Sequence, residues 1–513
     1  GRLLPVPSLD AIECVRQICY THKKIFRECS EKRKRDALTK YKDCEDDLDK
    51  VQVPANDRDG FRAVSRILWA NLFAGVPFGD PYEQYRPAHG PGATRERVSG
   101  NQKWLLKTWH RRLEDEFPYS EFASANFTHR LTDGCEEGTS LDGVEFVEPM
   151  DEAPVRVIFV PKTLKTPRVI AIEPSCMQFM QQAICRWLVP RIERGRYTAG
   201  RVNLKRQSIN AELALLSSQD GKYATLDLSE ASDRVHKSLV WDMLEVAPKF
   251  RDQVFACRST RAELPDGTIV PLQKFASMGS ALCFPMEAMV FFTIIVYNRI
   301  AQRGLRVSPT TVRKYSREVY IYGDDIIVPT DEAPATALAL SSFGLKVNTA
   351  KSFWAGKFRE SCGVDAYDGS YVTPTYVRHE QPSSRRDAEA VVSWCAMANQ
   401  LYARGFWGTV RSIRQCVERI VGKIPHGRST TQGLSWTSFS NSYQFSRWNK
   451  ELMRFERRAL VPVSKDVSDP LDGDGALLKC FGLIGSDSVS IEHLTRSVAR
   501  GQLTLKSRWV PAT

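Results

Sequence analysis

Three aspartates stand at the ends of short apolar runs, where they could hold a metal ion. Asp227 follows the run at residues 223–226, and Asp324 and Asp325 lie in a Tyr-Gly-Asp-Asp sequence between two further apolar runs. Two strands around a Gly-Asp pair predict a tight hairpin with both acids at its tip. Carboxylates suit Mg²⁺, and two such ions roughly 3.5–4 Å apart can bind the attacking and leaving oxygens of nucleotidyl transfer. The pattern predicts such a site, although an ordinary polar turn would also explain Asp324 and Asp325.

A strongly basic segment precedes these aspartates. Residues 155–160 and 168–172 are rich in β-branched side chains and are separated by a turn, so they predict a β-hairpin. Between residues 156 and 206 there are eleven Lys and Arg but only two Glu. Phosphoryl transfer depends on positioning and charge neutralisation, so cations must meet the triphosphate. The alternative is a solvated strand edge. The cations expected to contact phosphate are Arg156, Lys162, Lys165 and Arg168.

The chain as a whole is basic, which favours an anionic partner. Its 513 residues carry a formal net charge of +12, and its length predicts about three structural lobes. Such a charge favours nucleic acid over a membrane. The one long apolar run, residues 280–297, contains Pro285 and Glu287 and predicts a buried core helix. The 13 cysteines form no Cys-x-x-Cys pair, which suits a reducing cytoplasm.

The segment from residue 378 to residue 458 combines basic and aromatic side chains. It carries fourteen Lys and Arg against six Asp and Glu, with aromatic residues interleaved among them. Basic grooves with aromatic surfaces bind single strands and template–product duplexes, although most of these aromatic side chains are expected in the core. From about residue 385 onward helical patterns dominate. We therefore expect a helical lobe whose basic face follows an RNA backbone.

Six ordered motifs between residues 155 and 375 resemble a known family, the replicase subunits of positive-strand RNA bacteriophages of the levivirus group. A basic fingers motif and five palm motifs occur in the family's order, at residues 160–174, 224–233, 277–287, 321–327, 343–353 and 358–363. The resemblance implies an α+β right-hand polymerase fold: fingers, a palm with an antiparallel sheet and an RRM-like core, and a helical thumb. It implies an N-terminal helical region and the start of the fingers at 1–100, fingers at 101–220, palm at 221–375 with a fingers insertion near 245–275, and thumb and C-terminal region at 376–513.

The resemblance also implies roles for single residues. Asp227 and Asp324 would be the principal ligands of two Mg²⁺ ions, for which Mn²⁺ could substitute, and Asp325 would assist. Lys351 would protonate the leaving pyrophosphate; a surface lysine after a turn is the alternative. Ribose and template contacts are implied for Asp233, Gly279, Ser280 and Glu287. A helix N-cap role is the alternative for Asp233. Cys283 stands where eukaryotic viral polymerases usually have Thr.

The implied function is template-directed RNA synthesis from nucleoside triphosphates, which replicates a viral positive-strand genome. The resemblance further implies primer-independent initiation, the host elongation factors Tu and Ts and a ribosomal protein as partners, and a location in the bacterial cytoplasm with no membrane.

Two other functions remain open at this point. A reverse transcriptase shares the palm chemistry but usually has Ala at the position of Gly323. A catalytically silent RNA-binding scaffold would have little reason to keep all three aspartates. A serine hydrolase finds no support, because the sequence has no Gly-x-Ser-x-Gly motif.

Overall fold

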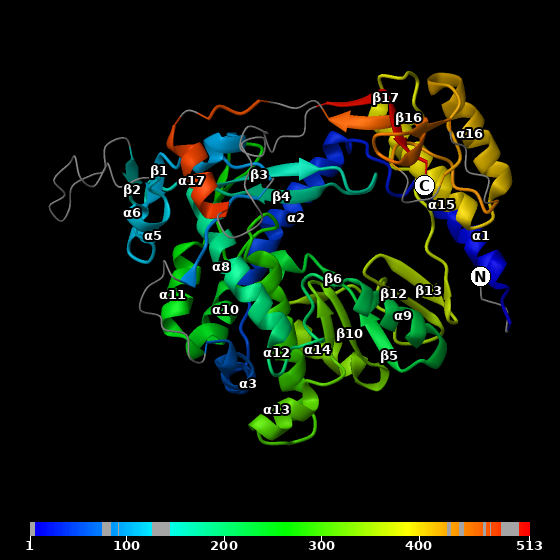
Figure 1. The fold of residues 1–513 in the computed structure, drawn as a ribbon. Helices are drawn as coiled ribbons and strands as arrows, with labels where there is room; N and C mark the ends of the chain where they lie inside the picture. Colours follow the sequence, from blue (N-terminus) through cyan, green and yellow to red (C-terminus); the bar gives the residue numbers. More distant parts are fainter. Residues whose placement is uncertain are drawn as a thin grey trace.

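The computed structural model describes most of the chain. The described residues are 6–73, 84–90, 92–125, 144–427, 432–440, 446–464, 468–471, 473–483 and 502–512. Helices and short strands are mixed along the chain (Figure 1), so the predicted α+β class is confirmed.

Three helices lead the chain: α1 (Leu9–Tyr20), α2 (Glu31–Asp49) and α3 (Ala55–Phe73). The charged helix α2 exposes most of its ionic side chains but buries one face, which packs on β4. The more apolar α3 packs against the central helix α12. The N-terminal region is thus bound to the rest of the molecule along most of its length.

The predicted basic hairpin is present. Its strands β3 (Val155–Val160) and β4 (Arg168–Ile172) pair in antiparallel register. The short strands β7 (Arg261–Glu263) and β8 (Ile269–Pro271) extend this sheet in the order β4-β3-β7-β8. The sequence around residues 245–275 therefore contributes two short strands to the sheet of the hairpin.

The remaining elements of this half surround the hairpin sheet on the left of Figure 1. They are η1 (Gly100–Trp104), β1 (Thr108–His110), α5 (Arg111–Glu114), α6 (Tyr119–Phe122), β2 (Glu145–Val147), α8 (Ser175–Arg194), α10 (Lys237–Met243), η3 (Leu244–Val246) and α11 (Pro248–Ala256). The helix predicted at residues 177–192 is confirmed as α8.

The region predicted as the palm is built on a three-stranded antiparallel sheet, here called the palm sheet. Its strands are β5 (Tyr223–Leu226), β10 (Asp325–Pro329) and β9 (Tyr320–Tyr322), in the order β5-β10-β9. Two small sheets flank it. One pairs β6 (Leu228–Ser229) with β11 (Lys346–Val347), and the other has three strands, β12 (Phe358–Ser361), β13 (Val364–Tyr367) and β14 (Ser370–Tyr371). The neighbouring helices are α9 (Ser208–Asp220), η2 (Ser232–Arg234), α13 (Pro309–Tyr315), η4 (Thr330–Glu332) and α14 (Ala333–Ser342).

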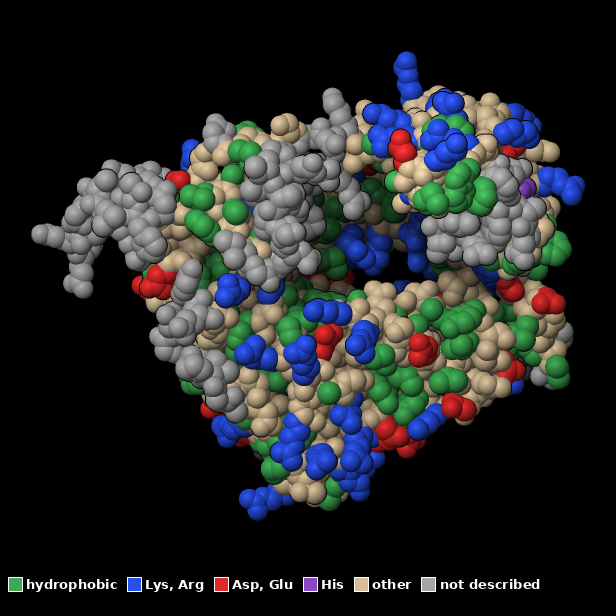
Figure 2. All heavy atoms as spheres, in the orientation of Figure 1, with side chains coloured by type: hydrophobic (Ala, Val, Ile, Leu, Met, Phe, Trp, Pro, Cys, Tyr) green, Lys and Arg blue, Asp and Glu red, His purple; other side chains and the backbone are tan. Residues whose placement is uncertain are grey.

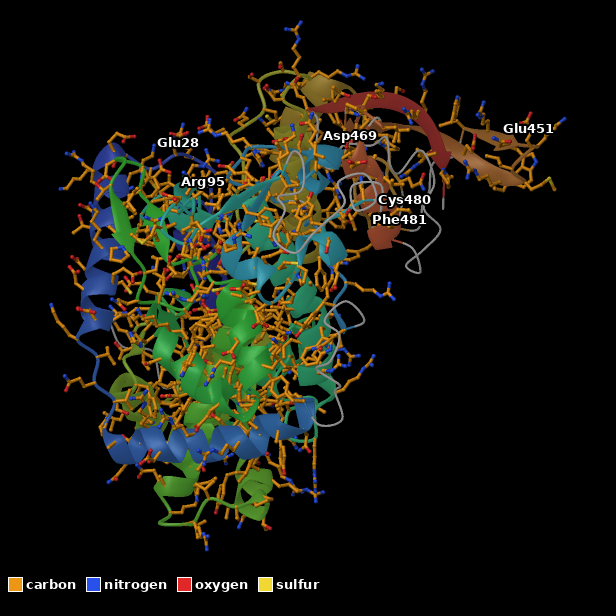
Figure 3. The ribbon with its side chains drawn as sticks, turned by 90° about the vertical axis from the view of Figure 1, so that its left-hand side faces the viewer. Glu28, Arg95, Glu451, Asp469, Cys480 and Phe481 are labelled. Carbon is orange, nitrogen blue, oxygen red and sulfur yellow. The ribbon has the colours of Figure 1, made fainter. Side chains whose placement is uncertain are left out.

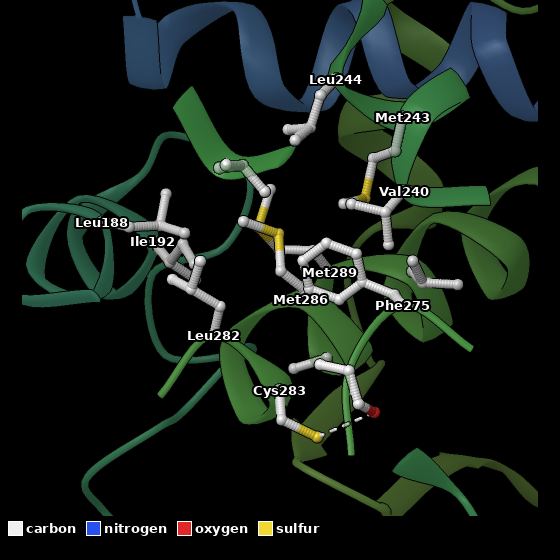
Figure 4. Packing of buried hydrophobic residues seen from close by; sticks show 14 of the residues in the cluster. Leu188, Ile192, Val240, Met243, Leu244, Phe275, Leu282, Cys283, Met286 and Met289 are labelled. Carbon is white, nitrogen blue, oxygen red and sulfur yellow. Dashed lines mark hydrogen bonds between the residues drawn. The ribbon is translucent and has the colours of Figure 1, made fainter. Parts of the chain in front are cut away.

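The apolar run at residues 280–297 forms α12 (Cys283–Ala301), the centre of the main core. In the part of the chain that the structure describes, it is the one helix long and apolar enough to cross a membrane, but 89% of that stretch is buried inside the protein. Figure 4 shows Met286 and Met289 packed among Val240, Met243 and Leu282. The prediction of a buried core helix is confirmed.

The C-terminal region differs in part from the sequence prediction. Two helices, α15 (Ala388–Ala403) and α16 (Trp407–Val421), agree with the expected helical pattern. They are followed by a three-stranded antiparallel sheet of β15 (Arg447–Asn449), β16 (Arg454–Ser464) and β17 (Leu503–Pro511). The expectation that helices dominate after residue 385 is therefore wrong for the final strands. β16 and β17 pair over nine residues across a long separation in sequence, which local periodicity does not reveal.

Candidate active site

The three predicted aspartates meet at one end of the palm sheet. Ile326 of β10 lies opposite Leu226 of β5. Asp227 directly follows that pair on one strand, and Asp325 directly precedes it on the antiparallel strand, so the two aspartates come to the same end of the sheet. Asp324 lies one residue earlier, in the turn of the β9–β10 hairpin, and is exposed.

The turn between β9 and β10 requires glycine at position 323. Gly323 has φ of +58°, and a Cβ atom added there would lie 2.1 Å from the ring of Phe284. That ring packs edge-on against Tyr322, with 5.2 Å between ring centroids. An alanine, as expected in a reverse transcriptase, would need the Phe284 ring to move.

Two of the aspartates are held by hydrogen bonds. The backbone N–H of Cys362 and the hydroxyl of Ser361 donate to Asp325 Oδ1, over 3.0 and 3.1 Å. Asn348 donates to Asp227 Oδ2 over 2.8 Å. The Lys351 ammonium lies 3.8 Å from Asp227 Oδ1. Strand β12 and the turn after β11 therefore fix the two carboxylates in place.

The carboxylates repel one another. Burial raises the pKa of Asp227, and Asp324 adds to the effect, while Lys351 opposes it. Burial also raises the pKa of Asp325; the Cys362 N–H opposes this, and Asp324 adds to it. A nearby cation would relieve this repulsion and favour the ionised forms.

The donor chemistry of these residues suits a hard divalent cation, because all three supply carboxylate oxygens from two adjacent strands. Within the described ranges, however, no group of three or more His, Cys, Asp or Glu side chains is arranged so that it could hold a metal ion. The three aspartates are thus neighbours that would have to close further around an ion.

The basic hairpin reaches toward this end of the palm sheet. Burial and the neighbouring cations Arg168 and Lys351 lower the pKa of Lys162, while Asp324 and Asp227 raise it. Lys162 therefore lies within electrostatic reach of the aspartates, and part of its side chain is open to solvent. Figure 2 shows a hollow in the face of the molecule above the palm, with Lys and Arg side chains around it.

The other two predicted phosphate contacts differ in their surroundings. Lys165 is exposed in the turn of the hairpin. Arg156 lies near the base of β3, opposite Ile172, and its Nε atom is buried without a hydrogen-bond partner among the described residues. The hairpin therefore places these two cations at opposite ends.

The residues predicted to contact ribose fall into two groups: some lie near the aspartates, and others hold the loop before α12. Glu287, on α12, is 6% exposed, and its Oε2 atom is buried without a hydrogen-bond partner among the described residues. Burial raises its pKa well above the ordinary value, and the charges of Asp324 and Asp233 add to this. Glu287 is thus close enough to both Asp324 and Asp233 to feel their charges.

Asp233 lies inside the 3₁₀ helix η2, whose N-cap is Ala231, so the alternative of an N-cap role is wrong. The Lys274 ammonium donates to Asp233 Oδ1 over 2.7 Å. The sequence did not point to Lys274, because the two residues are 41 positions apart and neither belongs to a periodic pattern.

Gly279 and Ser280 support the loop before α12. Gly279 has φ of +131°, and an added Cβ would lie 1.9 Å from the carbonyl oxygen of Ala171 on β4. The buried hydroxyl of Ser280 donates to Gln181 of α8 over 3.0 Å. Cys283 points into the core, where its thiol contacts the carbonyl oxygen of Ala276 at 3.9 Å (Figure 4).

Sequence reasoning missed Asn348 as well as Lys274. Asn348 binds Asp227 through its side chain, and its backbone N–H donates to the Asp227 carbonyl oxygen over 2.8 Å. Its position three residues before Lys351, in the predicted fourth palm motif, was the available signal.

These features place three carboxylates and a basic hairpin at one end of an antiparallel sheet in an α+β fold. Residues 50–416 match the family described as RNA replicase, beta-chain, and the chain belongs to that family. It is 32% identical to the RNA-directed RNA polymerase subunit beta of Qbeta virus (strain MX1) over 305 residues, which are 59% of this chain and 46% of the relative. It is 34% identical to the RNA-directed RNA polymerase beta chain of Escherichia phage MS2 over 222 residues, which are 43% of this chain and 37% of the relative.

The chain therefore spans less than half the length of these relatives. Among solved structures, an insertion-loop deletion mutant of the RNA-dependent RNA polymerase of a human picorbirnavirus is similar with a TM-score of 0.44. It is 11% identical in sequence, over 80% of each chain. The resemblance to phage replicases seen in the motifs is confirmed by the family match.

Proposed function

We propose that the chain catalyses template-directed RNA synthesis from nucleoside triphosphates and so replicates a viral positive-strand RNA genome. The observation that carries the proposal is the meeting of Asp227, Asp324 and Asp325 at one end of the palm sheet. The match to a family whose named relatives are RNA-directed RNA polymerases supports it.

The three aspartates would hold two Mg²⁺ ions, which Mn²⁺ could replace. The chemistry that such ions supply is activation of the attacking 3′-hydroxyl and neutralisation of charge on the leaving oxygen. Asp227 and Asp325 are pre-oriented by Asn348 and Cys362, so the protein fixes the ligands before any nucleotide binds.

The cations of the basic hairpin would bind the triphosphate. Lys162 interacts electrostatically with Asp324 and Asp227, and Arg168 neighbours Lys162, so we assign these two cations the strongest phosphate contacts. Arg156, with its buried unpaired Nε, and Lys165, in the exposed turn, would extend this surface. Lys351, 3.8 Å from Asp227, would donate a proton to the leaving pyrophosphate.

Asp233 and Glu287 would lie on the sugar side of the nucleotide. The charges of Asp233 and Asp324 both raise the pKa of Glu287. Recognition of the 2′-hydroxyl distinguishes RNA from DNA precursors. Gly279 and Ser280 would act by shaping the loop that carries α12.

The partners that follow from this function are an RNA template, its product and nucleoside triphosphates. Primer-independent initiation, host elongation factors Tu and Ts with a ribosomal protein, and action in the bacterial cytoplasm belong to the same proposal. They are supported by family membership alone.

The glycine at position 323 favours RNA synthesis over reverse transcription. Its positive φ and the contact that an added Cβ would make with Phe284 disfavour the alanine typical of reverse transcriptases.

The test is nucleotide incorporation by the purified chain with an RNA template, Mg²⁺ and labelled ribo- or deoxyribonucleotides, with and without Tu and Ts. Asp324→Asn is expected to reduce incorporation at least 100-fold, because one charge of the ion-binding set is lost, while RNA binding persists. The exposed Asp331→Asn is the matched control and should retain activity. Incorporation of deoxyribonucleotides alone, or activity that survives Asp324→Asn, would contradict the proposal.

A further inference from the structure

A buried lysine contacts the carboxylate on the proposed sugar side of the site. Lys274 is 0% exposed, and its Nζ atom lies 2.7 Å from Asp233 Oδ1 and 3.0 Å from Glu45 Oε1. Burial alone lowers the pKa of Lys274, but the two carboxylates and Tyr41 together raise it above the ordinary value. Lys274 is therefore a permanent cation whose charge is balanced by carboxylates from two different elements.

The position of this ammonium is fixed from several directions. Arg258 donates to the carbonyl oxygens of Leu272 and Lys274 over 2.6 and 2.7 Å, which pins the backbone. Glu45 Oε2 accepts the backbone N–H of Gln273 over 2.6 Å. The ring of Tyr41 on α2 lies 3.6 Å from the Lys274 ammonium. Because these contacts fix the Lys274 ammonium, its position sets the orientation of the carboxylate that binds it.

That partner, Asp233, is only partly buried. Its side chain is 20% exposed, and Lys274 occupies Oδ1. Among the residues that the structure describes, no hydrogen bond reaches Oδ2. One carboxylate oxygen is thus anchored in the protein while the other is left to accept a hydrogen bond from a ligand.

A second group points to a ligand at the same place. Glu287 Oε2 is buried with no hydrogen-bond partner among the described residues, and both Asp233 and Asp324 influence its charge state. Buried polar atoms are rarely left without a partner. The region bounded by Asp233, Glu287 and Asp324 therefore has unfilled hydrogen-bonding capacity.

We propose that Lys274, held by Glu45 on α2, is a positioning residue for sugar selection. By binding Oδ1 it holds Asp233 in the orientation in which Oδ2 accepts a hydrogen bond from the 2′-hydroxyl of the incoming nucleotide. The inference rests on the proposed function, because it concerns the nucleotide bound at that site. It gives the N-terminal helix α2, which lies outside the palm, a part in telling ribonucleotides from deoxyribonucleotides.

The readout is the ratio of kcat/KM for a ribonucleotide to that for the matching deoxyribonucleotide, measured on the full chain with RNA template. Asp233→Asn is expected to lower this ratio about tenfold, the effect of one hydrogen bond. Lys274→Met should lower it to a similar degree, and the double variant should fall no further, because both changes remove the same contact. Lys274→Arg, which keeps the cation, should recover part of the ratio.

A purely structural role for Lys274 would lower stability without changing the ratio. The Lys274→Met change alone leaves two carboxylates without their cation. A second variant therefore combines Lys274→Met with Glu45→Gln, which removes one charge of each sign. Lys42→Met, also on α2 but paired with Asp266 on the surface, is the matched control and should keep the ratio.

The outcomes separate the two proposals. If Asp233→Asn lowers the ratio while the folded Lys274→Met/Glu45→Gln variant keeps the wild-type ratio, the positioning role is overturned. If Asp233→Asn itself leaves the ratio unchanged, the assignment of Asp233 to the sugar is wrong. If wild-type protein incorporates no ribonucleotide under any condition, including with Tu and Ts, while it incorporates deoxyribonucleotides, the proposed function fails.

Discussion

Glu173, which directly follows β4, is a buried carboxyl group next to the sheet of the basic hairpin. It is 4% exposed, and the Ser259 hydroxyl donates to its Oε2 atom over 2.5 Å. Burial raises its pKa from about 4.5 to about 7, although the hydrogen bonds from Ser259 and Gln181 oppose the shift. Between these two pH values the folded chain holds a proton at Glu173 that the unfolded chain has lost.

This proton makes stability fall as pH rises. Below about pH 4.5 Glu173 is protonated in both the folded and the unfolded chain. As the pH rises from there through about 7, the free energy of unfolding falls by roughly 3 kcal/mol in all. Glu173→Gln, which is neutral at every pH, is expected to lack this decline. The measurement is the free energy of unfolding in urea between pH 5 and 8.

The exposed Glu212→Gln on α9 is the control for the pH experiment and should decline as wild type does. Equal slopes for wild type and Glu173→Gln would show that Glu173 titrates normally in the folded chain.

At the scale of elements, the loop between β8 and α12 is fixed by a close backbone contact. The N–H of Ala171 on β4 donates to the carbonyl oxygen of Met278 over 2.9 Å. This approach is possible because Gly279 has no side chain: a Cβ would lie 1.9 Å from the Ala171 carbonyl oxygen. The loop therefore ties the basic hairpin to the N-terminus of α12, which carries Glu287.

Gly279→Ala is expected to destabilise the protein strongly. Gly267→Ala, at φ of +82° with no atom within 4 Å of the added Cβ, is the matched control and should cost about 1 kcal/mol from backbone strain alone. Gly279→Ala should cost about 2 kcal/mol more, because two backbones must separate. Urea unfolding of both variants measures the difference. Equal losses would mean that the loop can shift without resistance.

Local sequence patterns were sufficient for the elements that carry Asp227, Asp324 and Asp325. The strands around Asp227, Asp324 and Asp325, the basic hairpin and α12 all have short, regular apolar patterns, so their types could be predicted. The resemblance, not the patterns, implied that the palm holds an antiparallel sheet, and neither predicted the order of its strands.

Contacts between distant segments could not be predicted in the same way. The ion pairs of Lys274 join residues 45, 233 and 274, and β17 returns to β16 after a long excursion. Such pairings depend on how whole elements pack, and no local propensity encodes them. The surroundings of Asp233, which depend on these pairings, were accordingly the least predictable part.

At the scale of the whole molecule, both ends of the chain connect separate lobes. The chain leaves β16 in the C-terminal sheet, forms α17 (Asp474–Leu483) beside η1, and returns as β17 (Figure 1). Asp469 accepts the backbone N–H of Asn101 over 2.6 Å, and Lys479 donates to the Asn101 side chain over 2.9 Å. Figure 3 shows Asp469 and Cys480 on this crossing, while Glu451, in the β15–β16 turn, stands clear of the body.

The N-terminal segment makes the opposite connection. α1 lies between β13–β14 and α15, where Gln17 exchanges hydrogen bonds with the backbone of Thr375. Farther along, the Cys29 thiol donates to the carbonyl oxygen of Thr163 in the turn of the basic hairpin over 3.3 Å. The first 50 residues therefore link the C-terminal region to the hairpin that faces the aspartates.

Arg404 at the end of α15 is a polar anchor of α1. It donates to Glu13 Oε1 over 2.8 Å and to the carbonyl oxygen of Thr373 over 2.5 Å. Arg404→Met would leave these acceptors unpaired in a partly buried place, at a cost of about 1–3 kcal/mol. Because α1 has few other buried side chains, we expect the loss to appear as local opening of α1 rather than as global unfolding.

Hydrogen–deuterium exchange across residues 9–20 measures that opening. In Arg404→Met the amides of α1 should exchange at least tenfold faster, whereas those of α12 should be unchanged. Arg411→Met, on the exposed side of α16, is the matched control and should leave α1 protected. If α1 connects the lobes as its contacts indicate, RNA binding should weaken in Arg404→Met with the palm intact. Unchanged exchange in α1 would show that its other contacts, including the Gln17–Thr375 hydrogen bonds, hold the helix in place without Arg404.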